Sequence, residues 1–138
     1  QEIKTRYPKK KVVIYPDPSG VQRRTSANGR TDVSILQNAG FTVKHRHKHP
    51  AVRDRINSVN SMLLTSDGTV KVKVSPKCKH IINGLSKQVF KEGTQIPDKS
   101  SGFDHTNDAI GYMIEYLFPI RKDVPEFDES ATFGMATF

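Results

Sequence analysis

The distribution of hydrophobic and polar residues along the chain predicts strands and helices in alternation. Residues 12–15, V-V-I-Y, form a short apolar run that a proline ends, as is typical of a buried strand. Thr31 can cap a helix over residues 32–39 that a glycine ends, and residues 41–47 predict a second strand. The connection between the strands is long enough for them to lie parallel. The pattern therefore predicts an α/β fold.

The middle of the chain predicts a helix followed by an exposed strand. The helix starts at Pro50 and runs through residue 64. Its apolar residues recur at helical spacing and predict one packed face, while the opposite face carries Arg53 and Arg55. Residues 69–74, T-V-K-V-K-V, then alternate between apolar and basic positions. This alternation predicts a half-exposed basic strand.

Two more helices are predicted in the last third of the chain. One follows a proline and covers residues 77–90, and a loop rich in turn residues comes after it. The other begins near Asp104 and ends at a proline. Its apolar positions predict a core stripe made of Ala109, Ile110, Met113, Ile114, Leu117 and Phe118. We expect one domain over residues 1–122 and a weakly structured acidic tail over residues 123–138.

The charge of the chain is strongly positive and uneven. All 22 Lys and Arg residues lie in residues 1–122, and the tail carries only acids. A basic body is typical of a polyanion-binding protein, because contacts with phosphates release counterions. Nucleic acid is therefore the leading partner class, with a solvated basic surface as the alternative. The single cysteine supports neither a disulfide nor a zinc site, and no apolar run approaches the ~20 residues of a membrane span.

Three carboxylates are candidate metal ligands. Asp17 follows the first strand, where α/β sheets commonly place ligand-binding groups, although a turn role between two prolines is the alternative. Asp104 and Asp108 lie four residues apart on one face of the last helix, and helix capping would also explain Asp104. His105, in the same turn, can orient a carboxylate or a water. These acids on a basic body suggest a divalent metal site that acts on a phosphodiester.

Two basic runs are candidate phosphate contacts. Arg23 and Arg24 follow the D-P-S-G turn, close to the first carboxylate, and a solvated loop is the alternative. The run K-H-R-H-K-H-P places His45, His47 and His49 on one face of the second strand. That arrangement suits either a transition-metal site or a phosphate-facing basic edge.

The order of five motifs resembles one known family. The motifs are Y-P-D-P-S-G, T-D-V-S-I-L-Q-N-A-G-F, V-R-D-R-I-N-S-V-N-S-M-L, S-P-K-C-K-H-I-I-N-G-L and D-K-S-S-G-F-D-H-T-N-D-A-I-G-Y. Over residues 10–118 they are similar to the nuclease domain of the tailed-bacteriophage terminase large subunit. The resemblance implies an RNase H-like fold whose acids bind two Mg²⁺ or Mn²⁺ ions and cut concatemeric viral double-stranded DNA during packaging. It also implies a place C-terminal to a packaging ATPase, in the cytoplasm of the host bacterium.

The resemblance implies roles for individual residues as well. Asp17 matches the family's second acid, at the end of a strand, and Asp108 matches the third, on the last helix. His105 matches a histidine found in some members, and Asp104 lies beside the site as a further candidate ligand. The residues expected to contact DNA are Arg23, Arg24, Lys71, Lys73 and Lys99.

The chain departs from the family pattern in one respect. The family's first acid lies on the first strand of the sheet, and this strand and its neighbours have no counterpart before Val12. We therefore expect the C-terminal portion of the nuclease fold, completed by an upstream part of the same terminase, and an isolated chain that can be inactive. Residues 69–74 fall where the family has a β-hairpin insertion. The acidic tail is expected to contact the portal protein.

Other function classes fit the sequence less well. A restriction-type nuclease core needs a (D/E)-x-K signature shortly after Asp17, and none is present at a suitable spacing. A phosphate-cradling nucleotide binder needs a glycine-rich loop, but D-P-S-G-V-Q-R-R has a single glycine and no P-loop lysine. A non-catalytic nucleic-acid-binding module, or an inactive prophage remnant, explains the charge equally well. This main alternative leaves Asp17, His105 and Asp108 without a role.

Overall fold

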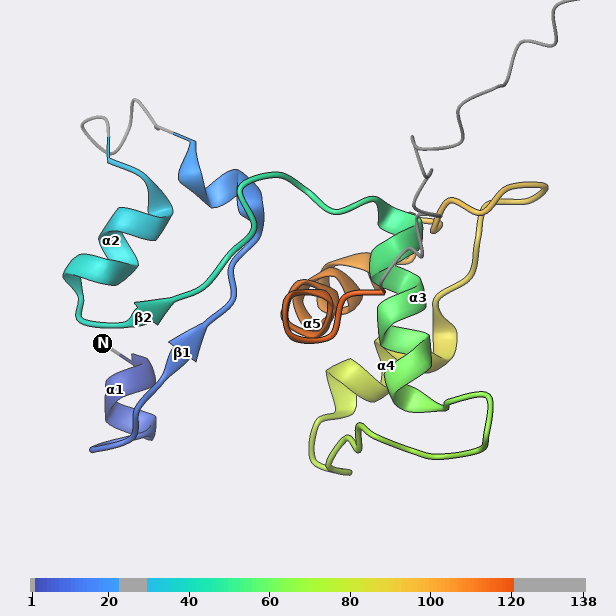
Figure 1. Ribbon diagram of the computed structural model, residues 1–138, viewed down its shortest axis with the longest axis horizontal. Coiled ribbons are helices and arrows are strands. Elements are labelled where there is room, and N and C mark those ends of the chain that lie inside the picture. Colours follow the sequence, from blue (N-terminus) through green and yellow to red (C-terminus); the bar gives the residue numbers. More distant parts are fainter. Residues whose placement is uncertain (1, 23–29, 121–138) are drawn as a thin grey trace, which may run out of the picture.

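Two groups of elements make up the computed structural model, which describes residues 2–22 and 30–120 (Figure 1). The first group holds α1 (Glu2–Arg6), β1 (Val13–Ile14), the 3₁₀ helix η1 (Pro18–Val21), α2 (Asp32–Asn38) and β2 (Thr42–Val43). The second group holds α3 (Val52–Leu63), α4 (Lys79–Lys87) and α5 (Asp104–Leu117). The chain passes from the first group to the second through residues 44–51, and α5 lies between the strands and α3 (Figure 1).

The two strands pair in parallel, as the length of their connection predicts. Val13 lies opposite Thr42, and Ile14 lies opposite Val43. Each strand is only two residues long, so both are shorter than the apolar runs of the sequence. Helix α2 forms the connection and packs against β2 and η1. The first group is therefore a strand–helix–strand unit.

Helix α2 begins at the predicted cap. The Thr31 hydroxyl accepts a hydrogen bond from the Ser34 backbone N–H, and the Ser34 hydroxyl accepts one from the Thr31 backbone N–H, each at 3.0 Å. Such caps typically stabilise a helix by about 1 kcal/mol. Gly40, with a φ of +83°, ends the turn that leads into β2.

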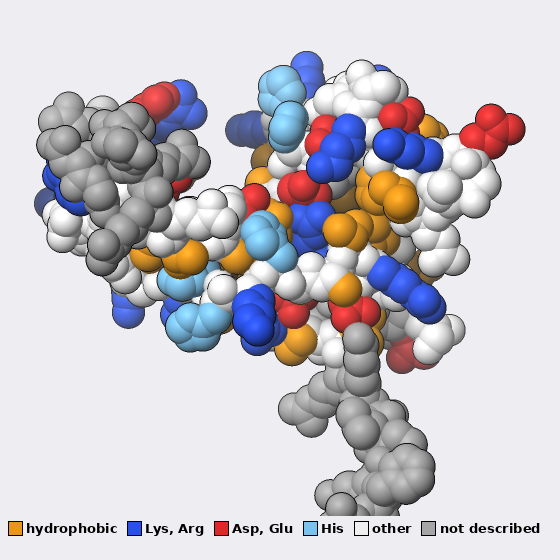
Figure 2. Space-filling model, turned by 90° about the horizontal axis from the view of Figure 1, so that it is seen from above, with side chains coloured by type: hydrophobic (Ala, Val, Ile, Leu, Met, Phe, Trp, Pro, Cys, Tyr) orange, Lys and Arg blue, Asp and Glu red, His pale blue; other side chains and the backbone are white. Residues whose placement is uncertain are grey.

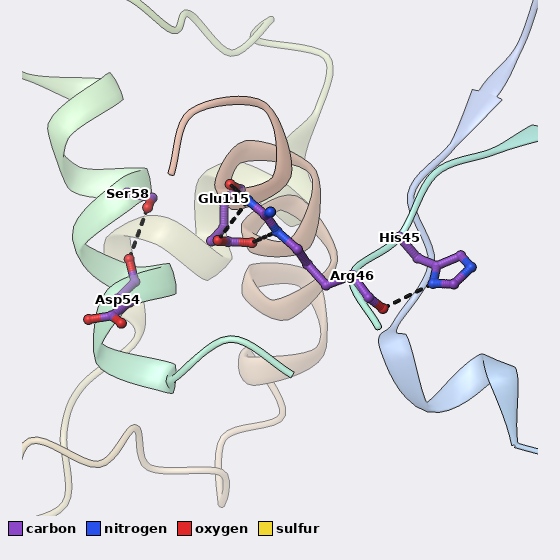
Figure 3. Close-up of polar contacts among 5 residues, drawn as sticks. All are labelled: His45, Arg46, Asp54, Ser58 and Glu115. Atoms are coloured by element: carbon purple, nitrogen blue, oxygen red, sulfur yellow. Dashed lines mark hydrogen bonds and ion pairs between the residues drawn. The ribbon is translucent and has the colours of Figure 1, made fainter. Parts of the chain in front are cut away.

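The hydrophobic core lies between the helices of the second group. Val59 and Met62 of α3 pack against Ile114 of α5, which is 1% exposed. Ser58 is fully buried beside them, and its hydroxyl donates to the Asp54 carbonyl in the preceding turn (Figure 3). Partly buried side chains surround this core: Leu63, Val72, Leu85 and Ile110. Within the described ranges, every helix is too short or too polar to cross a membrane.

The apolar stripe predicted for α5 is only partly right. Ile110 and Ile114 face the core. The other positions of the stripe are exposed among the described residues: Ala109, Met113, Leu117 and Phe118. The buried side of α5 includes Asp104, Gly111 and Glu115 instead. Hydrophobicity alone does not predict this side, because a charged residue such as Glu115 can be buried when it has an ion-pair partner.

Residues 69–74 do not form the predicted strand, and within the described ranges they pair with no other strand. The backbone N–H groups of Lys71 and Val72 instead donate to the Met62 carbonyl at the end of α3, at 3.1 and 2.8 Å. The predicted alternation is nevertheless visible in the burial, since Val72 packs against the core and Lys71 and Lys73 are exposed. The sequence pattern therefore predicted correctly that Val72 is packed and that Lys71 and Lys73 are exposed, but it predicted a strand that does not form.

Arg46 joins the strand-bearing group to α5 (Figure 3). Its Nε and Nη2 atoms donate to the two carboxylate oxygens of Glu115 at 3.1 and 3.2 Å, and Nη2 also donates to the Glu115 carbonyl. The guanidinium lies 5.3 Å from the ring centroid of Tyr116, whose ring contacts that of Tyr15 next to β1. Nδ1 of His45 lies 2.9 Å from the Arg46 carbonyl. These contacts orient the segment between the two groups.

Removal of the Arg46 charge is expected to destabilise the protein. In an Arg46→Met variant, the Glu115 carboxylate stays largely buried on α5 without its counter-charge, which should lower the free energy of unfolding by about 3 kcal/mol. Urea unfolding measures this loss. The double variant Arg46→Met/Glu115→Leu should recover most of it, and the exposed control Arg53→Met should stay within about 0.5 kcal/mol of the wild type. Equal losses in Arg46→Met and Arg53→Met would contradict the role of the ion pair.

Candidate active site

Asp17 lies directly after the first strand, at the start of η1. Its Oδ1 atom accepts a hydrogen bond from the Ser19 backbone N–H at 2.7 Å, so Asp17 caps the 3₁₀ helix. This is the turn role that the sequence left open. The carboxylate also reaches α5, because Oδ2 accepts a hydrogen bond from the Tyr112 hydroxyl at 3.2 Å. Nε2 of His49 lies 3.4 Å from Oδ1.

These contacts make Asp17 more acidic. Burial is the largest single influence on the pKa of Asp17 and acts to raise it. The hydrogen bonds from Ser19 and Tyr112, together with the nearby His49, outweigh burial and hold the pKa of Asp17 below its ordinary value. Asp17 is therefore an ionised carboxylate at neutral pH, as a cation ligand must be.

Tyr112 connects two of the three carboxylates that the sequence analysis selected, Asp17 directly and Asp108 through Arg55. Its hydroxyl donates to Asp17, and its ring is covered by the guanidinium of Arg55, 4.6 Å from the ring centroid. Nη2 of Arg55 in turn lies 2.7 Å from Oδ1 of Asp108. Burial raises the pKa of Tyr112, Arg55 lowers it in part, and both carboxylates raise it further. Tyr112 is thus a neutral donor, and Asp17 and Asp108 belong to one cluster of side chains.

Arg55 is the central cation of this cluster, and its predicted place on the exposed face of its helix is wrong. The residue is only 7% exposed. It lies on the buried face of α3, three and four residues before Ser58 and Val59. Burial is possible because Asp108 supplies a counter-charge and the Tyr112 ring covers the guanidinium. Neither partner could be identified from the sequence of α3.

His105 and Asp104 lie beside this cluster. The His105 side chain is 87% exposed, and the described hydrogen bonds and ion pairs do not join it to Asp17 or Asp108. Asp104 is 5% exposed, and its Oδ1 atom has no partner among the described residues. It lines a pocket of about 180 Å³ together with Arg55 and Asp108. Because a water takes up about 30 Å³, the pocket has room for waters that can bond such groups.

The three alternating histidines do not gather at one site. His49 contacts Asp17 and lies 3.4 Å from the Tyr112 hydroxyl, whereas the rings of His45 and His47 contact each other. The expected strand alternation fails here because β2 already ends at residue 43. His49 is a site residue that the sequence analysis considered only as part of the histidine run.

The predicted DNA contacts are exposed where the structure describes them. Lys71, Lys73 and Lys99 all have exposed side chains. Arg23 and Arg24 lie outside the described residues. Figure 2 shows acidic, histidine and basic side chains next to one another across the middle of one face of the molecule. The contact of these residues with DNA stays a prediction.

Asp17 and Asp108 carry the type of oxygen ligand that a hydrated divalent cation binds. Mg²⁺ takes oxygen ligands, usually keeps several waters and binds through one or two carboxylates together with substrate phosphates. Asp17 and Asp108 are two such carboxylates, and Arg55 engages one oxygen of Asp108. In the part of the chain that the structure describes, no three His, Cys, Asp or Glu side chains form a group that could hold a metal ion. Metal binding at Asp17 and Asp108 therefore stays a prediction from the sequence.

Comparison with known proteins identifies the family. The family model described as the terminase RNaseH-like domain matches residues 1–117, which is most of the chain. The chain therefore belongs to the terminase RNaseH-like domain family, and the resemblance seen in the sequence motifs is confirmed. The helices and small parallel sheet are compatible with this class of nuclease domain, whose members generally use divalent metals. Searches of curated proteins and of solved structures found no match.

The close approach of α5 to Arg55 can be tested at Gly111. A Cβ atom at Gly111 would lie 2.9 Å from Cγ and 3.0 Å from Cδ of Arg55. Gly111→Ala should therefore displace Arg55 and lower the free energy of unfolding by about 1–3 kcal/mol, although alanine is the better helix former. Urea unfolding measures the change, with the exposed Asn57→Ala on α3 as the control that should not lose stability. A Gly111→Ala variant as stable as the wild type would contradict the close packing.

The hydrogen bond from Tyr112 is expected to control the acidity of Asp17. Tyr112→Phe removes a donor to the ionised carboxylate, so the pKa of Asp17 should rise toward its ordinary value. Carboxyl-carbon NMR titration measures this shift.

The lowered pKa of Asp17 also predicts how the stability of the protein depends on pH. The contribution of ionised Asp17 to stability is present above its ordinary pKa of about 4 and is lost as the pH falls through the lower folded value. Tyr116→Phe is the matched control, since its ring contacts Tyr15 and Arg46. An Asp17 midpoint that is the same in the wild type and in Tyr112→Phe would show that the hydrogen bond has no such effect.

Proposed function

We propose that this chain forms part of a metal-dependent endonuclease that cuts concatemeric viral double-stranded DNA during genome packaging, within a terminase large subunit. The observation that carries the proposal is the chain of contacts that joins Asp17 to Asp108, which are far apart in the sequence, through Tyr112 and Arg55. Membership of the terminase RNaseH-like family and the basic body of the chain support it.

In this proposal, Asp17 and Asp108 hold Mg²⁺ or Mn²⁺ as part of a two-ion site. When bound, such ions polarise the phosphodiester and lower the pKa of an attacking water. Tyr112 orients the Asp17 carboxylate through its hydrogen bond, and Arg55 holds Asp108 through the ion pair. His49 contacts both Asp17 and Tyr112, where it can accept or release a proton.

Two residues at the start of α5 are proposed in secondary roles. His105 is open to solvent and can approach a bound phosphate or leaving group. Asp104 shares a pocket with Asp108 and is a further candidate ligand, with one oxygen that has no partner among the described residues. Lys71, Lys73 and Lys99 are proposed to contact the DNA backbone, together with Arg23 and Arg24, which lie outside the described ranges.

Further parts of the terminase are proposed to complete this site. We assign a third carboxylate to an upstream part of the same terminase, next to its packaging ATPase domain, because the cluster described here has two. Residues 123–138, which lie outside the described ranges, carry four acids and are proposed to dock on the portal protein. Cleavage would take place in the host cytoplasm during phage assembly.

Metal-dependent cleavage of plasmid DNA tests the proposal. The full-length protein should nick supercoiled plasmid in Mn²⁺ and should not do so in excess EDTA. Asp17→Asn and Asp108→Asn should each lower the cleavage rate at least about 100-fold, because each removes one of the charged ligands. Asp67→Asn is the matched control, since it makes the same chemical change at an exposed turn formed with Thr65 and Thr69.

Two results would decide against the catalytic assignment. Full cleavage by both Asp17→Asn and Asp108→Asn would remove these residues from the mechanism. Tight DNA binding by the full-length protein without cleavage in Mg²⁺ or Mn²⁺ would favour the non-catalytic DNA-binding module.

A further inference from the structure

A hollow lined by lysines lies at the end of β1 opposite to Asp17. We call it the lysine hollow, and its basic residues are Lys4 of α1 together with Lys9, Lys10 and Lys11, which precede β1. Its volume is about 280 Å³, and Tyr7 and Phe41 contribute to its walls. None of the described residues that line it is acidic, and all four lysines are exposed. The hollow is thus a local concentration of positive charge.

The backbone after α1 brings these lysines together. The Tyr7 backbone N–H donates to the Ile3 carbonyl at 2.9 Å, and the Lys10 backbone N–H donates to the Tyr7 carbonyl at 3.3 Å. Between them, Lys9 has a φ of 61°, in the left-handed region that residues other than glycine rarely adopt. Backbone strain of this kind is concentrated at functional sites in proteins. Lys9 thus has a backbone conformation that glycine would adopt more easily.

The opposite wall of the hollow positions Lys4. Its ammonium group lies 5.5 Å from the ring centroid of Phe41, within the range of a cation–π interaction. A Cβ atom at Gly40 would lie 3.6 Å from the same ammonium group, so the turn before β2 is in contact with it. Lys4 is therefore held at the wall by residues that are remote in the sequence.

The chemistry of the hollow favours a ligand with several negative charges. Four ammonium groups, with no acid among the described residues that line the hollow, create a positive potential that attracts anions. Lysine binds phosphate as a compact point charge and does not distinguish one base sequence from another. In a DNA duplex, each strand presents one phosphate for about every 3.4 Å of helix axis. Several lysines can therefore contact one strand at the same time.

We propose that the lysine hollow binds the phosphate backbone of DNA and anchors it near the candidate active site. The choice of DNA, among molecules that carry phosphates, rests on the proposed function. Figure 1 shows α1 at one end of β1 and η1 at the other. The six residue-to-residue steps from Lys11 to Asp17 span at most about 20 Å. This distance corresponds to about six base pairs along the axis of a DNA duplex.

The salt dependence of DNA binding tests the anchor independently of cleavage. Binding of the full-length protein to a fluorescently labelled duplex is measured by anisotropy in EDTA at several salt concentrations. The slope of log K against log salt concentration decreases by about 0.9 for each phosphate contact that is lost. The triple variant Lys9→Gln/Lys10→Gln/Lys11→Gln should therefore have a slope that is smaller in magnitude by about two to three.

A matched triple variant controls for net charge. Lys77→Gln/Lys79→Gln/Lys91→Gln removes the same charge from exposed positions outside the hollow, and its slope should change by less than about one. Equal changes of slope in the two triple variants would overturn the proposal, because net charge alone would then explain binding. Displacement of DNA from the wild type by inorganic phosphate at constant ionic strength, without displacement from the Lys9–Lys11 variant, would also overturn it and assign the hollow to free phosphate.

A single substitution separates binding from folding. Lys9→Gly removes one ammonium group and also relieves the left-handed backbone, so the melting temperature should be unchanged or higher while DNA affinity falls several-fold. Wild-type affinity in Lys9→Gly would contradict a phosphate contact at this residue. Because these measurements need no metal, failure of the catalytic assignment would appear in the cleavage assay and leave the slopes unchanged.

Discussion

The ion pair between Arg46 and Glu115 is the interaction on which the relation between the two halves of the molecule depends. The described helices and strands of the first group do not pack closely against those of the second, so side chains form the junction. Arg46 makes three hydrogen bonds to one residue of α5 and lies against the Tyr116 ring, which also contacts Tyr15 beside β1. An arginine suits this position because its planar guanidinium binds both carboxylate oxygens at once. The hydrogen bond from Tyr112 of α5 to Asp17 crosses between the same two groups.

A second ion pair, between Arg55 and Asp108, lies within the candidate site. Arg55 is buried on α3, and it is compensated by Asp108 and covered by Tyr112, both on α5. Tyr112 extends the same chain of contacts to Asp17 in the other group of elements. The result is a chain of contacts from Asp108 through the Arg55 cation and the neutral Tyr112 to Asp17. Arg55 balances the charge of Asp108, and the Tyr112 hydroxyl stabilises ionised Asp17 by its hydrogen bond.

The charge distribution relates the candidate site to the lysine hollow. Acidic ligands alone would repel a DNA backbone, so a nuclease needs positive charge near its carboxylates. Here Lys9–Lys11 come before β1 and the carboxylate Asp17 comes after it. One short strand therefore separates the basic residues from the acidic one. DNA bound at the hollow would thus be held by positive charge one short strand away from Asp17.

The sequence by itself determined the local elements and the family. The Thr31 cap, the parallel strand–helix–strand unit, the three later helices and the motifs around Asp17 and Asp108 could be read from it, because capping, periodicity and turn residues act over a few positions. Only the tertiary structure decided which side chains meet. It buried Arg55, exposed much of the apolar stripe of α5, left residues 69–74 unpaired among the described strands, and placed His49 rather than His105 beside Asp17. These outcomes depend on partners from distant parts of the chain, and periodicity within one element carries no information about such partners.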